Sequence, residues 1–310
     1  MEVFTSALGA VLTLFVFMAG GYVFARWGLV KPDFSPQLSG VVFKFFFPLM
    51  LLKVILLQTD IASVVAGWRL LVISTALIAL GIPLGKLVAH LMKGRIAVAP
   101  AQFATMFPNY IFMGMPVILA MYGEIASATL VMYSLPMSLL VSTLGYMVMA
   151  STGGVNWRAA FNPCTVAIVV GLIWLALGVP VPGFVAEVIT LGNNVVSPVA
   201  MFQVGMVIAS FKFQGVGELR DAALFSALRL VGLPLVVAVV LTLVGLRGLE
   251  VSVPAMVTAM PVAANMTITA GAVGRHEEIS GQLVFVSTVL SLITIPLMAV
   301  VVDMILGLVA

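Results

Sequence analysis

The chain has 310 residues, of which 63% are hydrophobic and only 8% are charged. Soluble proteins carry about 25% charged residues, so this composition excludes a soluble globular protein and leaves no room for a soluble catalytic domain. The formal net charge is +3, but the basic residues are scattered singly between apolar runs, a pattern that indicates membrane orientation and argues against a nucleic-acid-binding surface.

Ten apolar stretches follow one another along the chain, each close to the length of about 20 residues that a membrane-spanning helix needs. None of them alternates with a period of two, so helices are favoured over the strands of a transmembrane barrel. The sequence therefore predicts an all-α polytopic membrane protein with ten transmembrane helices, at residues 6–25, 39–58, 66–91, 98–121, 125–150, 161–178, 185–211, 221–245, 253–273 and 281–306.

The basic residues also predict the orientation of these spans. The amino terminus carries Glu2 and no basic residue, so we expect a retained first span and not a cleaved signal peptide. Most Lys and Arg residues fall at alternate connections, which face the cytoplasm by the positive-inside rule. We therefore expect a multi-pass protein of the cytoplasmic (inner) membrane with both termini outside, and with these cytoplasmic residues: Arg26, Lys31, Lys86, Lys93, Arg95, Arg158, Lys212, Arg220 and Arg275.

A polar linker at residues 151–160 divides the chain into two halves, residues 1–150 and 161–310, with five predicted spans each. An odd number of spans inverts the second half relative to the first, and inverted repeats are common among secondary transporters. A shift of 153 residues places Pro108 on Pro261. The sequence thus predicts two inverted five-helix repeats joined by a cytoplasmic linker.

The fourth span contains Pro108, Asn109, Gly114 and Pro116 near its middle. Each proline removes a backbone donor and clashes with the preceding turn, so we expect this helix to be broken. Broken backbone persists inside a membrane only where it is buried in protein or lines a watery cavity. Asn109 can pair with the freed backbone groups, and the adjacent Tyr110 is a further candidate for substrate contact.

The ninth span repeats this device, with Pro261 followed by Asn265 in a stretch of small residues. Two interrupted helices at matching positions point to a substrate site near the middle of the membrane. The amino ends of the half-helices each carry roughly +0.5 charge and free amide donors, which suits an anion. Two kinked packing helices without a site are the alternative interpretation.

Two other spans carry polar residues of interest. Asn194 in the seventh span lies within about one helical turn of Ser197 and Pro198, so these residues either face a cavity or join neighbouring helices. Arg229 lies about 12 Å into the eighth span from Asp221 if that helix is straight. An arginine at this depth is a candidate functional residue, whose partner is either a carbonyl group freed by a broken helix or a carboxylate of the substrate.

Several chemistries lack their residues in this chain. No predicted span has Asp or Glu near its centre, which disfavours a proton-coupled pump. The single cysteine, Cys164, and two distant histidines, His90 and His276, exclude an internal disulfide and suggest no metal site. Paired catalytic carboxylates and a phosphate-binding glycine loop are not apparent. We therefore expect neither an enzyme nor a bound cofactor.

Three segments resemble the auxin efflux carrier family, whose bacterial members include carriers of malonate and other organic acids. The segments are PNYIFMGMPVILAMYGE (108–124), AMPVAANMTITAGAVG (259–274) and FNPCTVAIVVGLIW (161–174). The resemblance implies two inverted five-helix repeats whose fourth and ninth helices cross beside the substrate, with Asn109 and Pro116 at one interruption and Pro261 and Asn265 at the other. The chain lacks the long central loop and the third-span acid of plant members, so auxin itself is not implied.

We therefore expect a secondary transporter that carries a small organic anion, such as a carboxylate, by alternating access. Its other partner is the lipid bilayer, and no nucleic acid is expected. A sodium-coupled symporter similar to the bile-acid carriers is the alternative. Since a membrane potential favours export of an anion, import would need a cation. The sequence does not distinguish between cargoes, between a monomer and a homodimer, or between an elevator and a rocking motion.

Overall fold

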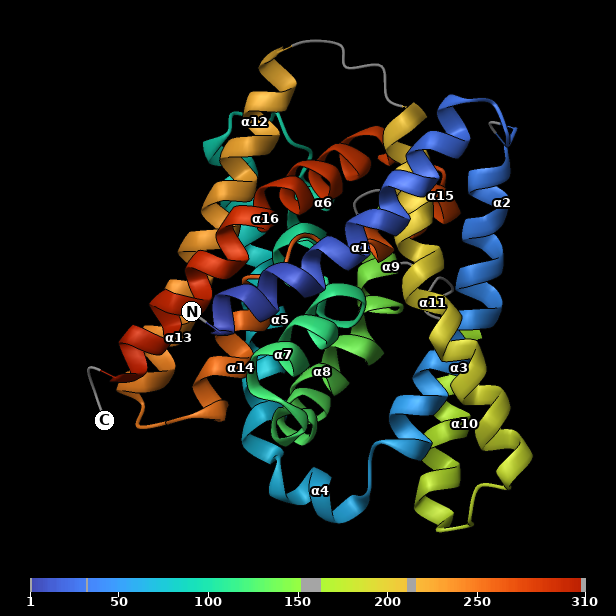
Figure 1. Ribbon diagram of the computed structural model, residues 1–310, viewed down its shortest axis with the longest axis vertical. Coiled ribbons are helices and arrows are strands. Elements are labelled where there is room, and N and C mark those ends of the chain that lie inside the picture. The colour runs from blue at the N-terminus through green and yellow to red at the C-terminus, as the bar shows by residue number, and fades with distance from the viewer. Residues whose placement is uncertain (1, 32, 152–162, 211–215, 308–310) are drawn as a thin grey trace.

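The computed structural model describes residues 2–31, 33–151, 163–210 and 216–307 (Figure 1). Most of the predicted linker at residues 151–160 therefore lies outside the described part. Within the described residues the elements are all helices, joined by turns, and the one β contact is an isolated antiparallel bridge between Pro108 and Val262. The all-helical architecture predicted from the sequence is confirmed.

The first half consists of α-helices interrupted by short π-helical segments, η1 to η3, and one 3₁₀ turn, η4. In chain order these are α1 (Glu2–Arg26), α2 (Phe34–Val41), η1 (Val42–Phe46), α3 (Phe47–Leu52), η2 (Lys53–Leu57), α4 (Ile61–Ala66), α5 (Trp68–Leu91), α6 (Val98–Met106), η3 (Tyr110–Gly114), α7 (Met115–Tyr122), η4 (Glu124–Ala126), α8 (Ser127–Val141) and α9 (Leu144–Ala150).

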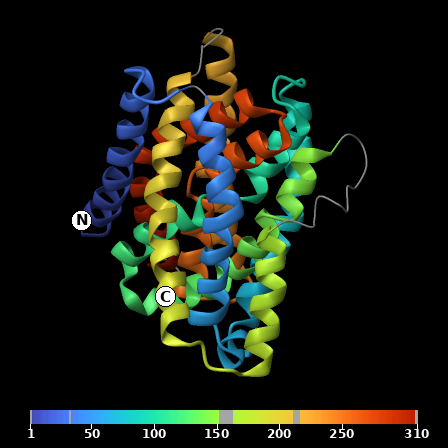
Figure 2. The same cartoon turned by 90° about the vertical axis from the view of Figure 1, so that its right-hand side faces the viewer.

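The second half has fewer and longer helices, with one described π-helical segment, η6. In chain order these are α10 (Pro163–Leu177), α11 (Gly183–Ser210), α12 (Val216–Ala227), η6 (Leu228–Gly232), α13 (Leu233–Leu243), α14 (Leu249–Thr258), α15 (Asn265–Val273) and α16 (Glu277–Gly307). Figure 2 shows α11, α10 and the segment containing α3 side by side on one face of the molecule, and both α10 and α11 contact α3.

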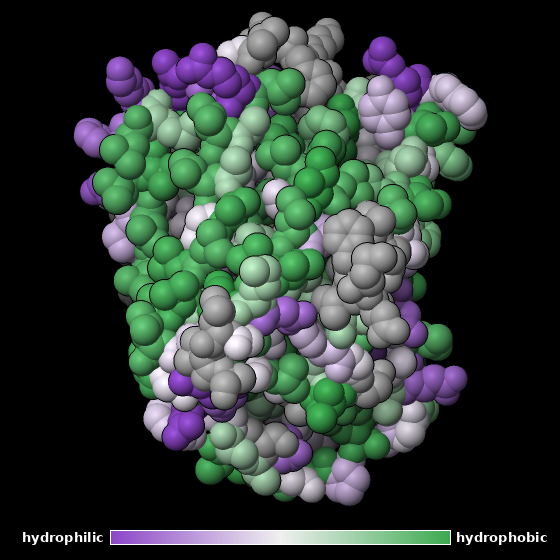
Figure 3. Space-filling model, turned by 60° about the vertical axis from the view of Figure 1, so that its left-hand side comes forward, coloured by the Kyte–Doolittle hydropathy of each residue, from purple (hydrophilic) through white to green (hydrophobic). Residues whose placement is uncertain are grey.

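Within the described part of the chain, five helical segments are long and apolar enough to cross a membrane. They are Trp68–Leu91, Thr129–Ala150, Gly183–Ala209, Leu219–Leu243 and Glu277–Gly307. The outer surface fits this, because hydrophobic side chains form a broad band between hydrophilic residues at the two ends of the molecule (Figure 3). A soluble monomer rarely exposes an apolar patch of this extent. The protein is therefore a polytopic helical membrane protein.

Three of the described π-helical segments end two residues before a proline. Pro48, Pro116 and Pro234 are each the second residue of the α-helix that follows, α3, α7 and α13 respectively. Proline has no N–H and cannot donate to the carbonyl four residues earlier. The change of hydrogen-bonding pattern just before each proline has this local cause, and it was not anticipated from hydropathy.

Glycines allow two pairs of helices to approach closely. A Cβ atom on Gly21 of α1 would lie 1.8 Å from the carbonyl oxygen of Phe202 in α11, and one on Gly205 would lie 1.9 Å from the carbonyl oxygen of Met18. Similarly, a Cβ atom on Gly85 of α5 would lie 2.4 Å from the Cα of Gln102 in α6. Small residues permit such contacts between helix backbones. The contact between α5 and α6 holds in place the half-helix that leads into the candidate site.

Candidate functional site at the helix interruptions

Two interrupted helices meet inside the protein. Helix α6 ends at Met106 and the next helical segment begins at Tyr110, while α14 ends at Thr258 and α15 begins at Asn265. The two non-helical stretches run antiparallel to each other. The N–H of Asn109 donates to the carbonyl oxygen of Pro261 at 2.8 Å, and the N–H of Ala263 donates to that of Phe107 at 3.1 Å.

Pro108 explains the local course of the first stretch. A residue that precedes proline is driven out of the helical region by contact with the proline ring, and Phe107 is accordingly extended, with φ −122° and ψ 99°. An extended residue turns its backbone groups away from its own helix. The carbonyl of Phe107 is thereby free to accept a hydrogen bond from the second stretch.

A serine of α16 completes the pairing of the second stretch. Ser287 Oγ accepts a hydrogen bond from the N–H of Val262 at 3.0 Å and donates to the carbonyl oxygen of Val284 at 3.1 Å. The side chain is fully buried. The sequence analysis did not identify Ser287, although Ser287, Thr288 and Ser291 form a polar cluster within the tenth span.

The two asparagines predicted as site residues are both buried at the interruptions. Asn109 is 3% exposed and Asn265, the first residue of α15, is 5% exposed. Among the described residues, Asn109 Nδ2 has no hydrogen-bond partner. Most buried polar groups in proteins are paired, so an unpaired amide at the meeting point of two broken helices is a candidate ligand contact.

Several main-chain amides beside the prolines are already occupied. Tyr110 N donates to the carbonyl oxygen of Pro108 at 2.8 Å, Met266 N to that of Ala263 at 2.9 Å, and Thr267 N to that of Ala264 at 3.1 Å. We expected the amino ends of the half-helices to offer free amide donors to an anion. In this conformation the Asn109 side chain, and not these three amides, supplies an unpaired donor.

Arg229 lies in η6 and is 4% exposed. Its Nε donates to the carbonyl oxygen of Ala104 at 2.6 Å, and its Nη1 donates to the carbonyl oxygen of Met260. In a continuous helix the carbonyl of Ala104 would accept from residue 108, but Pro108 has no N–H to give. Of the two partners left open by the sequence, the structure shows the freed carbonyls.

Gly114 and Pro116 follow the first interruption. Gly114 N donates to the carbonyl oxygen of Asn109 at 2.8 Å, and a Cβ atom on Gly114 would lie 3.4 Å from both that oxygen and the Cγ of Met260. Gly114 is thus in close contact with the second interruption. Pro116 is the second residue of α7.

The other two predicted site residues have surroundings of a different kind. The hydroxyl of the buried Tyr110 lies 3.1 Å from Ser138 Oγ of α8, to which it donates. Asn194 in α11 is exposed, and its Oδ1 accepts a hydrogen bond from Asn193 Nδ2 at 3.4 Å. Asn194 therefore differs from Asn109 and Asn265, which are buried.

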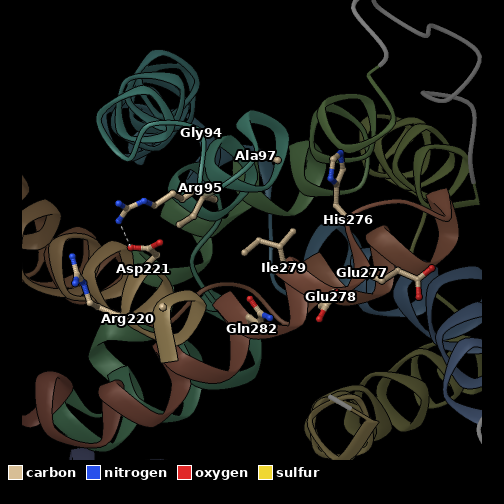
Figure 4. Close-up of a pocket in the computed structure, with 12 residues that line it drawn as sticks. Gly94, Arg95, Ala97, Arg220, Asp221, His276, Glu277, Glu278, Ile279 and Gln282 are labelled. Carbon is tan, nitrogen blue, oxygen red and sulfur yellow. Dashed lines mark hydrogen bonds and ion pairs between the residues drawn. The ribbon is translucent and has the colours of Figure 1, made fainter. Parts of the chain in front are cut away.

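A separate cavity of about 920 Å³ opens at the end of the molecule where the loop before α6 meets α12 and α16 (Figure 4). Arg95 and Asp221 face each other across part of it and form an ion pair of 3.0 Å. His276 lies at the start of α16, where partial burial, together with the nearby charge of Arg275, lowers the pKa of its imidazole. The cavity is lined by Gly94, Arg95, Ile96, Ala97, Gly217, Arg220, Asp221, His276, Glu277, Glu278, Ile279 and Gln282.

Within the described ranges there is no group of three or more His, Cys, Asp and Glu side chains that could hold a metal ion. The polar groups at the interruptions are amides, hydroxyls, carbonyls and one guanidinium. Such a set suits binding and orientation of a polar ligand.

Comparison with known proteins identifies the family. The sequence model of a family described as membrane transport proteins matches residues 6–156 and residues 147–299. The chain is also similar to a protein of Methanothermobacter thermautotrophicus named as an uncharacterized transporter, with 25% identity over 308 residues that cover 96% of this chain and 99% of that relative. The protein therefore belongs to the membrane transport protein family, and the resemblance to the auxin efflux carriers found in the sequence is confirmed.

Proposed function

We propose that the protein is a secondary transporter of a small organic anion, such as a carboxylate, which binds where the two interrupted helices cross. One observation carries the proposal: the interruptions are hydrogen-bonded to each other, and the buried Asn109 amide beside them has an unpaired donor. Membership of a transporter family supports movement of a cargo, and not catalysis, as the activity.

The proposed architecture has ten membrane spans in two inverted repeats, residues 1–150 and 161–310. Five spans are the long apolar segments, and the rest are formed by α1, α10 and the composite rods α2 to η2, α6 to α7 and α14 to α15. The antiparallel pairing of Pro108 with Val262 supports this arrangement, because a two-fold axis in the membrane plane brings equivalent segments together in opposite directions.

The chemistry of the site favours an anion. Asn109 offers N–H donors to carboxylate oxygens, and Asn265 lies at the amino end of α15, where the helix dipole contributes roughly +0.5 charge. In the cytoplasmic membrane, a potential contributes about 2.3 kcal/mol per charge per 100 mV. Export of an anion therefore needs no coupling ion, and alternating access at the crossing would suffice.

The first test is thermal stabilisation of the detergent-purified protein by a carboxylate panel of malonate, other dicarboxylates, monocarboxylates, indole-3-acetate and bile acids, with and without sodium. A specific ligand at 100 times its Kd stabilises the folded state by about 2.7 kcal/mol. We expect one class of small carboxylates to raise Tm without sodium, and Asn265→Ala to abolish this increase and the flux.

The matched control is Asn193→Ala, an amide truncation in α11 outside the interruptions. It should retain both the cargo-dependent increase in Tm and the flux. Unchanged flux in Asn265→Ala would overturn the proposed site. Stabilisation that requires sodium would instead favour a symporter similar to the bile-acid carriers.

A further inference from the structure

The guanidinium of Arg229 occupies a distinctive electrostatic position. Its two hydrogen-bond acceptors are the carbonyl oxygen of Ala104, in the last turn of α6, and that of Met260, two residues beyond the carboxyl end of α14. Each carboxyl end of a helix carries roughly −0.5 charge, so two ends that meet present about one negative charge. The side chain of Arg229 brings one positive charge to the place where these ends converge, and both of its partners are main-chain oxygens.

In transporters built around broken helices, unwound carbonyls and the carboxyl ends of half-helices are the groups that coordinate a coupling cation. The same kinds of group bind Arg229 here. We propose that Arg229 is a resident cation, which permanently fills the position that a coupling cation such as Na⁺ would otherwise take. The consequence for transport rests on the proposed carrier function: cargo binding at the crossing needs no sodium.

The two bonds of Arg229 to main-chain carbonyl oxygens support this role. The residue is 4% exposed, two of its three guanidinium nitrogens are bonded to the protein, and the third, Nη2, is buried with no partner among the described residues. Arginine stays protonated under all ordinary conditions, so the charge is fixed. The η6 segment that carries it lies within the rod formed by α12 and α13 and ends just before Pro234, so the charge belongs to the second half, while one of its partners belongs to the first half.

The test is the cation dependence of Tm in three variants of the purified full-length protein, measured without cargo. Arg229→Ala removes the charge and leaves space, whereas Arg229→Met removes the charge but fills the space. Arg247→Ala is the matched control, because Arg247 also caps a helix carboxyl end, donating to the carbonyl oxygen of Thr242 at 2.8 Å, but is exposed. Each protein is compared in choline, sodium and millimolar methylguanidinium chloride at constant ionic strength.

We expect the wild type and Arg247→Ala to show the same Tm in all three salts. Arg229→Ala should lose about 5–15 °C in choline and recover part of it in methylguanidinium or sodium, with a gain that rises with the logarithm of the cation concentration. The Arg229→Met protein should also have a lower Tm than the wild type, and neither methylguanidinium nor sodium should raise it. Rescue that depends on both charge and space distinguishes a cation position from simple packing.

Two results would overturn the inference. One is stabilisation of the wild type by sodium over choline, and the other is an Arg229→Ala protein that responds to neither cation. If Arg229→Ala does not fold, Arg229→Lys decides, because its ammonium keeps the charge and a sodium response in this variant would contradict the inference. If no carboxylate raises Tm but the cation responses are as expected, the proposed cargo is rejected and the proposed role of Arg229 is retained.

Discussion

The main-chain N–H of Asn109 donates a hydrogen bond to the carbonyl oxygen of Pro261 at 2.8 Å. This bond links the interruption of the fourth predicted span to that of the ninth. Neither group could find a partner in its own helix, because a proline interrupts the helical pattern at each place. The two interruptions therefore satisfy each other, and the side chain of Asn109 is held at their junction.

Asn109→Ala should separate stability from binding. Because Asn109 Nδ2 has no partner among the described residues, its removal sacrifices no hydrogen bond of that donor, and a buried unpaired polar group is itself unfavourable. We expect Tm without cargo to change by less than about 3 °C, while the increase in Tm with carboxylate is lost. Differential scanning fluorimetry with and without cargo measures both quantities.

Ser287→Ala is the counterpart to this variant. Ser287 Oγ accepts from Val262 N, so its loss leaves a buried N–H unpaired, which costs about 1–3 kcal/mol. Ser287→Ala should therefore lower Tm. A large destabilisation in Asn109→Ala, with none in Ser287→Ala, would contradict this account of the junction.

Much of this site could be predicted from local sequence signals. Proline in the interior of a helix removes a backbone hydrogen bond and kinks or breaks the helix, although α5, α8, α11, α14 and α16 each continue past one. A polar amide beside such a proline in an apolar span indicates a buried polar site. These rules led to Pro108, Asn109, Pro261 and Asn265 without a structure. They depend only on residue type and on neighbours within one or two turns, which is why these candidate residues could be named from the sequence.

The partners of these residues depend on tertiary structure and were beyond such rules. Ser287 bonds to a stretch that a turn and a helix separate from it, and Arg229 reaches one carbonyl in α6 and one in the non-helical stretch after α14. Hydropathy gives the depth of a side chain but not the direction in which it points. For the same reason, hydropathy could not show that the side chain of Asn194 in α11 is exposed. The sequence analysis therefore placed Asn194 among the candidate site residues together with the buried amides.

Closely packed glycines give a further prediction on stability. Gly21→Ala and Gly205→Ala should each destabilise the protein, because the added Cβ would meet a backbone oxygen of the facing helix within 2 Å and overpacking typically costs about 1–3 kcal/mol. Gly40→Ala in α2 is the control, since a Cβ there has no heavy atom within 4 Å. Thermal unfolding should therefore show lower Tm for the first two and an equal or higher Tm for Gly40→Ala. Equal Tm values in all three would contradict the close contact of α1 with α11.

His276 predicts a dependence of stability on pH. Partial burial, and then the charge of Arg275, lowers the pKa of His276 in the folded protein, so the unfolded chain binds more protons below the ordinary histidine pKa of about 6.5. The contribution of His276 is thus fully favourable above this pH and is lost as the pH falls below it. Arg275→Gln should reduce this loss by removing one of its two causes.

His276→Asn supplies the control for that measurement. His276 has a positive φ of 61°, a conformation that asparagine adopts more readily than most residues, so the variant keeps the backbone and removes the titrating group. The change in Tm between pH 7.5 and 5.5 should be smaller in His276→Asn than in the wild type. An equal change would assign the pH dependence to other groups.

The ion pair between Arg95 and Asp221 gives a prediction on the mouth of the large cavity. It joins the loop before α6 to α12 over 3.0 Å, and the Arg95 side chain is 53% exposed. Exposed ion pairs contribute about 0.2–1 kcal/mol, so Arg95→Ala and Asp221→Ala should lower Tm only slightly. In a double-mutant cycle the coupling should shrink as salt rises from 0.05 to about 1 M, where the screening length falls to roughly 3 Å.

Removing this ion pair should change the rate of transport more than it changes the stability of the protein. If the pair restrains the movement of α12 relative to the loop before α6, then removing either charge changes the rate of carboxylate flux, and the exchanged pair Arg95→Asp with Asp221→Arg restores it. Arg220→Ala is the control, because Arg220 lines the same cavity next to Asp221 but is not a member of the ion pair. Flux that depends on Arg220 as strongly as on Arg95 would indicate that the total charge of the cavity, and not the ion pair, sets the rate.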